Sequence, residues 1–425
     1  MANKRVVVIG GGPAGHDAAT YAARFGAEVT LIERDIVGGA AHLRDCVPSK
    51  SMIATGGALS FARRLDGMGL ANVETGVEAE HLRARIQGIE QRLEQSVTQL
   101  LTSQGVTIHR GTGRLLSPNE VCVDTPNGVV ELTADAIVLA TGSRPRIPEW
   151  APIDHERVLT TRDAYPPEQI PEHLIVVGSG VTGVEFVHMF ASLGSEVTLI
   201  VSRQQVLPQK DPEAAALLEQ NFLDRGVQLL KGARATEILR KGQSVTVHCS
   251  DGRIAQGSHA LLAIGSDPNS QDLGLENTDI AIDSDGYIQV DHNLRSSVPT
   301  IYAAGDLSGK LPLSSVAAMQ GRKIAEHIMG LHEGREHRHL DYDKAASAIF
   351  TEPEIADVGL AEAEAFATGR KIRVTKVPFS SNAKHAAELI SVVALAVSAN
   401  LKVQDIHESL FVYPTLSEAL SEAAE

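Results

Sequence analysis

Two copies of one glycine-rich pattern constrain the fold of this chain more than any other feature. In the first copy, the apolar run Val6–Ile9 is followed at once by Gly10-Gly11-Gly12-Pro13-Ala14-Gly15. In the second copy, Leu174–Val177 is followed by Gly178-Ser179-Gly180-Val181-Thr182-Gly183. Short apolar runs of this kind are typical of strands buried on both faces of a parallel sheet. Each copy predicts a dinucleotide-binding unit, because the glycines let the backbone approach a pyrophosphate and the following helix N-terminus stabilises its charge.

The residue that ends the second strand of each unit indicates which nucleotide it binds. In the first unit the strand Glu28–Ile32 leads to Glu33, a carboxylate that can accept a hydrogen bond from a ribose hydroxyl. In the second unit the strand Glu196–Val201 leads to Ser202 and Arg203. Without a carboxylate a 2′-phosphate is not repelled, and both side chains can donate to it. The second unit therefore favours NADPH over NADH, the alternative being that Arg203 is an ordinary solvated loop charge.

The remaining strand-and-turn patterns repeat along with the glycine motifs. Each motif is followed at a similar distance by a further strand and turn, Ala136–Ser143 and Leu261–Asn269. The run Thr300–Ala304 ends in Gly305-Asp306, which places an acid at the carboxyl end of a strand, where doubly wound sheets bind ligands. We predict an α/β protein with two Rossmann-like dinucleotide-binding domains and a C-terminal α+β domain. The expected boundaries are 1–150 with 276–330 for the first domain, 151–275 for the second and 331–425 for the third.

Composition argues against several other classes of protein. The 425 residues include 38 Lys and Arg against 53 Asp and Glu, a net charge of −15 without a basic block, so we expect no nucleic acid partner. No apolar stretch approaches the ~18 residues of a membrane span, and no targeting segment is visible, so we expect a cytoplasmic protein. The three cysteines, Cys46, Cys122 and Cys249, show neither a disulfide framework nor metal-ligand spacing. We expect no metal site, and we expect Cys122 and Cys249 to be buried in strands.

The motifs taken together resemble one protein family. Both glycine units, the turns Ala140-Thr141-Gly142 and Gly305-Asp306, and the segment Cys46-Val47-Pro48-Ser49-Lys50 are similar to those of the flavoprotein disulfide reductases, the family of dihydrolipoamide dehydrogenase and glutathione reductase. The resemblance covers nearly the whole chain. It implies FAD on the first unit, NAD(P)H on the second, and a homodimer in which the C-terminal segment of one subunit completes the site of the other.

The resemblance also implies which residues form the sites. Lys50 and Glu185 would form an ion pair beside the flavin, where a cation stabilises the charge of the reduced ring; the alternative for Glu185 is an acid on a helix surface. The residues implied for FAD are Gly10, Gly12, Pro13, Ala14, Gly15, Glu33, Arg34, Gly39, Ala40, Cys46, Lys50, Gly113, Ala140, Thr141, Gly142, Gly305 and Asp306. The residues implied for NAD(P)H are Gly178, Gly180, Val181, Thr182, Gly183, Glu185, Ser202, Arg203 and Gly265.

The chain departs from the family at the positions that carry disulfide chemistry. The family motif G-G-x-C-x-x-x-x-C-x-P-S-K has Ala41 at its first cysteine, the interchange thiol, while Cys46 matches the second. In the C-terminal motif H-x-H-P-T-x-x-E, Tyr413 replaces the second histidine and Glu418 remains. Disulfide exchange through a dithiol needs both sulfurs, and a phenol with a pKa of about 10 cannot replace an imidazole base at neutral pH. We therefore expect no dihydrolipoamide dehydrogenase activity.

A third departure lies in the C-terminal domain, where we expect that residues are missing from the sequence rather than that the domain is truly shortened. The chain joins Lys384 almost directly to Ala387, where family members carry a further strand-rich stretch.

The reaction that remains is flavin reduction by NAD(P)H followed by electron transfer to a small acceptor. A scaffold with Ala41, Cys46 and Tyr413 resembles the NAD(P)H:quinone reductase branch of the dihydrolipoamide-dehydrogenase-like proteins, so we predict an NAD(P)H:quinone oxidoreductase. Cys46 would lie against the flavin, and Tyr413 of the other subunit would line the acceptor pocket. The alternatives are a single-cysteine peroxidase or oxidase using Cys46, a soluble transhydrogenase, and a non-catalytic FAD-binding, redox-responsive partner protein.

Overall fold

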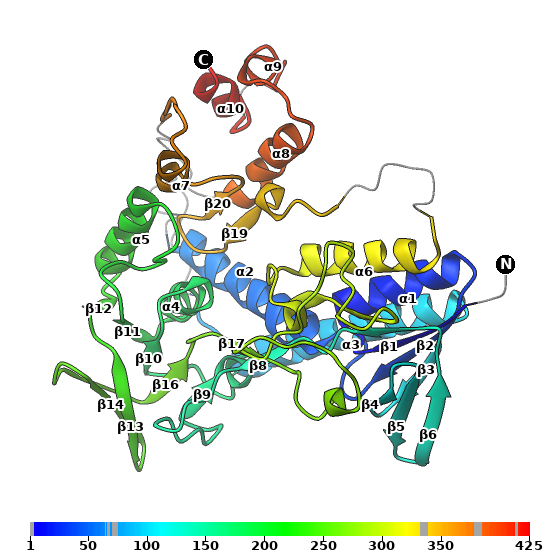
Figure 1. Cartoon of the computed structure of the whole chain (residues 1–425). Coiled ribbons are helices and arrows are strands. Elements are labelled where there is room, and N and C mark those ends of the chain that lie inside the picture. The colour runs from blue at the N-terminus through cyan, green and yellow to red at the C-terminus, as the bar shows by residue number, and fades with distance from the viewer. Residues whose placement is uncertain are drawn as a thin grey trace.

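The computed structural model describes residues 4–63, 65, 69, 75–165, 167–331, 339–377, 385–412 and 415–425. Two five-stranded parallel sheets organise these residues, and Figure 1 shows the helices packed around them. The predicted α/β fold with two Rossmann-like units is thereby confirmed.

The first sheet has the strand order β18-β7-β1-β2-β3. Its strands are β1 (Arg5–Ile9), β2 (Glu28–Glu33), β3 (Thr107–Arg110), β7 (Ala136–Leu139) and β18 (Ile301–Ala303). Helices α1 (Pro13–Arg24) and α6 (Ser314–Ile328) lie side by side over this sheet (Figure 1). They pack so closely that a Cβ on Gly321 would lie 2.0 Å from the carbonyl oxygen of Ala14. The edge strand β18 comes from much later in the sequence than the other strands of this sheet. It places the Gly305 turn beside the first glycine motif.

The second sheet repeats the first, with the order β12-β11-β10-β16-β9. Its strands are β9 (Val158–Thr160), β10 (His173–Val177), β11 (Glu196–Val201), β12 (Gln228–Lys231) and β16 (His259–Leu262), and its helices are α4 (Val181–Leu193) and α5 (Pro212–Asp224). Helix α2 (Val47–Ala62) of the first unit packs against α4, and a Cβ on Gly56 would meet Ser192 Cβ at 2.8 Å. This contact sets the segment that begins with Cys46 against the start of α4.

Each unit also carries a three-stranded antiparallel meander. The first is formed by β4 (Thr112–Ser117), β5 (Glu120–Thr125) and β6 (Gly128–Thr133), the second by β13 (Ala235–Lys241), β14 (Ser244–Cys249) and β15 (Ile254–Gly257). The units are joined by the antiparallel pair β8 (Ser143–Pro145) and β17 (Ser266–Pro268). Cys122 and Cys249 are buried in β5 and β14, as predicted. Apolar residues recur at helical spacing over residues 79–104, which predicts a long surface helix, and α3 (Ala79–Ser103) covers this span.

The C-terminal segment combines a small sheet with short helices. Its elements are β19 (Ser347–Ile349), β20 (Ile355–Asp357), α7 (Glu362–Ala367), α8 (Ala386–Ser398), α9 (Val403–His407) and α10 (Glu418–Ala423). The two strands pair with each other, and α8 packs against both of them. Among the described helices, none has both the length and the apolar character that a membrane crossing requires.

Candidate active site

The first glycine motif is a cradle that only glycine can form. Gly10 has a φ of +103°, and a Cβ there would lie 2.3 Å from the Ala140 carbonyl oxygen. A Cβ on Gly15 would lie 1.8 Å from the Gly10 carbonyl oxygen, and one on Gly39 would lie 2.4 Å from Gly12 Cα. The chain is therefore drawn tightly around the start of α1. No side chain caps this helix, so its first N–H groups have no side-chain acceptor and can bind a pyrophosphate.

Glu33 closes the cradle at the end of β2. Its side chain is buried, Oε2 accepts a hydrogen bond from the Gly11 N–H at 2.7 Å, and Oε1 accepts one from the Asp35 N–H at 2.7 Å. The carboxylate is fixed at the position where the dinucleotide-binding motif places the acceptor for the ribose. Its remaining lone pairs can accept hydrogen bonds from ribose hydroxyl groups. Arg34, the next residue, is exposed.

The turns at Thr141 and Asp306 lie at the carboxyl ends of neighbouring strands, β7 and β18. Asp306 belongs to the short helix η5 (Gly305–Ser308), and its Oδ2 accepts a hydrogen bond from Ser143 Oγ at 2.6 Å. Thr141 Oγ1 donates to the Asn269 carbonyl oxygen at 2.8 Å, and Asn269 Nδ2 donates back to the Thr141 carbonyl oxygen at 2.8 Å. These reciprocal bonds hold the equivalent turns of the two units together.

Three parts of the chain converge on one ion pair. Lys50 Nζ on α2 lies 2.9 Å from Glu185 Oε2 on α4, which is 5% exposed. The other carboxylate oxygen, Oε1, accepts a hydrogen bond from the Phe350 N–H at 3.0 Å, and the Phe350 ring centre lies 4.6 Å from Lys50 Nζ. The ion pair expected from the resemblance is therefore formed. Phe350 was not predicted, since no motif marks it in the sequence.

Cys46 occupies the junction of two kinds of helix. It is the last residue of the π-helix η1 (Ala41–Cys46), directly before α2, and its thiol is free and half-buried. Ala40 precedes η1. Single π-turns are frequent at functional sites. The two other cysteines of the chain are buried in the antiparallel meanders, so each lies in a different part of the fold from Cys46.

The second glycine motif repeats the geometry of the first. Gly178 has a φ of +111°, and a Cβ there would lie 2.2 Å from the Ala263 carbonyl oxygen. A Cβ on Gly183 would lie 1.9 Å from the Gly178 carbonyl oxygen, whereas one on Gly180 would meet nothing within 4 Å. Val181 opens α4 with 41% of its surface exposed. The floor of the cradle is thus fixed by backbone contact, and the space above Gly180 is open.

The residues proposed to read the nucleotide ribose follow β11. Ser202 and Arg203 are both exposed, and the Arg203 carbonyl oxygen accepts a hydrogen bond from the Gly232 N–H at 3.0 Å. This bond anchors the backbone while the guanidinium lies at the surface. Thr182 lies in the first turn of α4, and Gly265 follows β16 with a φ of +101°.

Comparison with known proteins identifies the family of this chain. The family model described as pyridine nucleotide-disulphide oxidoreductase matches residues 4–321, and the model of that family's dimerisation domain matches residues 345–387 and 382–424. The chain belongs to the pyridine nucleotide-disulphide oxidoreductase family. Use of a flavin and a pyridine nucleotide follows from membership. The two matches of the dimerisation domain overlap at residues 382–387, and Lys384 lies outside the described residues.

Three relatives illustrate the range of the family. The chain is 39% identical to an NAD(P)H dehydrogenase (quinone) of Mycobacterium tuberculosis over 99% of this chain and 93% of the relative. It is 32% identical to the dihydrolipoyl dehydrogenase of Chlamydia muridarum over 98% of this chain and 95% of the relative. The crystal structure of LpdA from Mycobacterium tuberculosis superposes with a TM-score of 0.92 at 38% identity, covering 99% of each chain.

The family's C-terminal motif is only partly described here. Tyr413 lies outside the described residues, and Glu418 is the first residue of α10. Both remain predicted site residues. Gly113 has a packing reason to be glycine, because a Cβ there would lie 3.2 Å from side-chain atoms of Ile9 and Ile32.

Sequence reasoning missed a cluster of polar atoms beside η1. Four buried atoms in this region have no hydrogen-bond partner: His16 Nε2, His42 Nδ1, Asp45 Oδ1 and Arg162 Nε. Burial, with His16 nearby, lowers the pKa of His42, and burial raises the pKa of Asp45 to about 6 against the opposing charge of Arg162. Unpaired buried polar atoms are rare and call for a partner. Together with the glycine cradle they fit a large polar cofactor such as a flavin dinucleotide.

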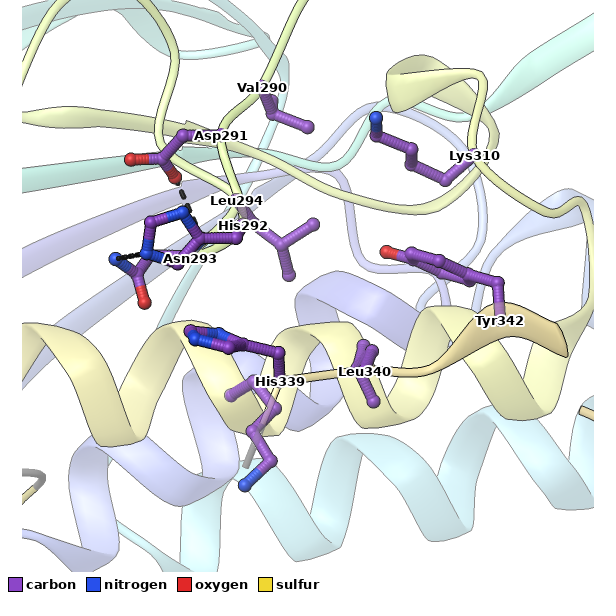
Figure 2. A pocket seen from close by; sticks show the side chains of 10 residues that line it. Val290, Asp291, His292, Asn293, Leu294, Lys310, His339, Leu340 and Tyr342 are labelled. Atoms are coloured by element: carbon purple, nitrogen blue, oxygen red, sulfur yellow. Dashed lines mark hydrogen bonds between the residues drawn. The ribbon is translucent and has the colours of Figure 1, made fainter. Parts of the chain in front are cut away.

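A pocket of about 290 Å³ lies behind the Gly305 turn, and none of its lining residues was predicted from the sequence. Figure 2 shows His292 and His339 close together at one side of it, in edge-to-face contact with ring centres 4.5 Å apart, and Tyr342 at the other side. The Tyr342 hydroxyl accepts a hydrogen bond from Gln320 Nε2 at 3.0 Å, and Gln320 Oε1 accepts one from the Gly305 N–H at 2.7 Å. Gln320 is fully buried, so it supports the Asp306 turn from the side opposite Ser143.

Proposed function

We propose that this protein is an FAD-dependent oxidoreductase that passes hydride from NADPH or NADH through the flavin to a quinone, without disulfide reductase activity. One observation carries the proposal: the Lys50–Glu185 ion pair is intact, while Ala41 leaves Cys46 as a lone thiol where disulfide exchange needs two. A 39% identical relative bears the name NAD(P)H dehydrogenase (quinone), which supports the choice of acceptor.

The cofactor sites follow from the two cradles. FAD would lie across Gly10, Gly12, Gly15 and Glu33 with Asp306 at its ribityl and phosphate region, and NADPH would lie across the second motif with Arg203 at its 2′-phosphate. Residues 1–150 with 276–330, residues 151–275 and residues 331–425 would then form the FAD, NAD(P)H and dimerisation domains. In a homodimer the C-terminal segment, with Tyr413 and Glu418, would complete the site of the other subunit.

The protein's own part in the reaction is positioning and electrostatics. Bound FAD would supply a carrier that accepts two electrons from the nicotinamide and gives them to the acceptor. Glu185 and the Phe350 ring hold the Lys50 ammonium in place, and the Phe350 N–H holds the second oxygen of Glu185. A fixed cation at this point stabilises the negative charge that arrives with a hydride, and it needs no reorganisation at the moment of transfer.

The choice of acceptor is tested by measuring NADPH oxidation without oxygen. We expect the flavin-loaded protein to oxidise NADPH with a small benzoquinone and to leave lipoamide and glutathione disulfide unreduced, because no interchange thiol is present. The same assay with NADH tests the Arg203 prediction, for which a lower KM with NADPH is expected. Turnover of either disulfide would show that another sulfur replaces the missing one and would contradict the proposal.

A Cys46→Ser variant separates the quinone reductase from the single-cysteine alternative. A thiolate beside a flavin gives a long-wavelength charge-transfer absorbance, which we expect the variant to lose while it keeps most of its quinone turnover. A peroxidase that cycles Cys46 through a sulfenic acid would lose all peroxide turnover in the same variant. Absorbance spectra and both assays on one preparation check the prediction, and loss of quinone turnover together with peroxide turnover would favour the peroxidase.

A further inference from the structure

Asp45 and Arg162 form an incomplete ion pair beside Cys46. Asp45 Oδ2 lies 3.5 Å from Arg162 Nε, and the two side chains are 31% and 33% exposed. Asp45 Oδ1 and Arg162 Nε are nevertheless covered atoms without hydrogen-bond partners. The two charges attract each other, but these two atoms remain without partners, and the exposed remainder of each side chain lets protons exchange with solvent.

The pair is connected to the Asp306 turn. Arg162 Nη2 donates to the Ser143 carbonyl oxygen at 3.1 Å, and Ser143 Oγ donates to Asp306 Oδ2 at 2.6 Å. Asp306 is the acid that the resemblance places at the flavin. Arg162 and Ser143 therefore link two carboxylates: Asp45, which is next to Cys46 in the chain, and Asp306, which lies on the flavin side.

The other charges near Asp45 are already engaged. Arg44, on η1 itself, donates to Asp35 Oδ2 at 2.8 Å, and Lys50 on α2 is paired with Glu185. On α3, Glu90 faces Arg44, and Glu94 pairs with Arg110.

Burial is the largest cause that raises the pKa of Asp45 to about 6, and Asp306 adds to the rise, while Arg162 and Arg44 oppose it. Cys46 and Tyr165 also lie within the electrostatic reach of this network. At neutral pH the Asp45 carboxyl is therefore mostly ionised, but a small increase in nearby negative charge would protonate it.

We propose that Asp45 is the redox-linked proton carrier of this site: it binds a proton when two electrons enter beside the Asp306 network and releases that proton to the acceptor when they leave. The inference rests on the proposed function. An electron pair adds negative charge near both carboxylates; Asp45 has a buried oxygen without a hydrogen-bond partner, whereas Asp306 already accepts a hydrogen bond from Ser143. Such a group is needed because Tyr413 stands where the family keeps its histidine base.

The protons and electrons balance over one turnover. NADPH loses a hydride, which is two electrons and one proton, and becomes NADP⁺. A quinone gains two electrons and two protons and becomes a hydroquinone. The second proton comes from the Asp45 O–H bond, which breaks as a quinone O–H bond forms, and solvent then supplies a proton to Asp45 when the next electron pair enters.

Proton counting during reduction tests this directly. The flavin-loaded protein is reduced stepwise by light and a sacrificial donor, without oxygen, in weakly buffered solution with a pH indicator near pH 7. We expect wild type to take up about one proton more per two electrons than Asp45→Asn. The matched control is Asp251→Asn, which removes a carboxylate paired with Arg253 in the turn between β14 and β15 and should take up as many protons as wild type. Equal counts for wild type and Asp45→Asn would overturn the proposal.

A second variant covers the outcome in which Asp45→Asn does not retain flavin. Arg162→Gln keeps the Asp45 carboxyl but removes the cation that stabilises its ionised form. The pKa of Asp45 therefore rises further, and Asp45 already holds its proton before the flavin is reduced. The extra uptake should then disappear at pH 7 and return at higher pH, and an uptake unchanged with pH would overturn the proposal. No electron acceptor is present in this experiment, so the number of protons taken up does not depend on whether the natural acceptor is a quinone. The NADPH oxidation assay with benzoquinone and disulfides decides that question separately.

Discussion

Replacing Lys50 with methionine is expected to slow flavin reduction by NADPH about 100-fold, the loss usual when one fixed charge that stabilises a transition state is removed. Stopped-flow bleaching of the flavin absorbance measures this rate directly. Glu185 would be left 5% exposed with only the Phe350 N–H as partner. Removing one member of a buried pair is costly, and because the Lys50 side chain is 33% exposed we expect a loss of about 2 kcal/mol in the free energy of unfolding.

Two further variants distinguish the charge from the packing. Lys50→Met combined with Glu185→Gln removes the unpaired carboxylate, so stability should recover while hydride transfer stays slow. Lys231→Met is a matched control: Lys231 on β12 forms a similar bridge to Glu219 on α5 at 2.7 Å, with side chains 37% and 13% exposed, so its loss should lower stability and leave the flavin reduction rate unchanged. A Lys50→Met protein that is reduced at the rate of wild type would remove Lys50 from the mechanism.

The fold could be predicted because its determinants are local. Each unit can be recognised within about 35 residues by its succession of strand, glycine turn, helix and strand. Hydrogen bonding within the sheet then fixes the parallel order of the strands. The repetition of the pattern at Gly10 and Gly178 showed that whole units recur, and both glycine turns have the tight backbone contacts that the motif implies. The long helix α3 followed in the same way from its period.

The missed parts of the site depend on contacts between distant segments. Phe350 reaches Glu185 across 165 residues, and nothing in the local sequence Ile349-Phe350-Thr351 marks it. Arg162 meets Asp45 for the same reason: a lone arginine before an aspartate reads as a surface charge until tertiary packing covers its Nε. Asp45 precedes Cys46 in the sequence, which is equally compatible with an influence on the thiol and with a helix-surface position, and only the burial of its Oδ1 in the structure separates the two.

A Gly183→Ala variant is expected to lose NADPH binding while keeping its flavin. Its Cβ would lie 1.9 Å from the carbonyl oxygen and 2.8 Å from the carbonyl carbon of Gly178, and backbone atoms cannot move aside as a flexible side chain can. The start of α4 must therefore lift away from β10, at a cost of about 3 kcal/mol, the upper end for overpacking. NADPH affinity, measured by titration of the oxidised protein, should fall at least about 100-fold. Glu185, two residues further along α4, would move as well, so reduction at saturating NADPH should also be slow.

Gly180→Ala in the same turn shows whether the nucleotide lies where the motif implies. Gly180 has an extended backbone with φ −72°, which alanine adopts readily, and nothing lies within 4 Å of its Cβ position. The free energy of unfolding should stay within about 0.5 kcal/mol of wild type, because neither strain nor contact is introduced. A pyrophosphate resting on this turn would nevertheless meet the added methyl group, so NADPH affinity alone should weaken. If Gly180→Ala binds NADPH with the affinity of wild type, the pyrophosphate does not lie on this turn. The tight backbone of the second unit would then be retained from the duplicated fold and would not form a binding site.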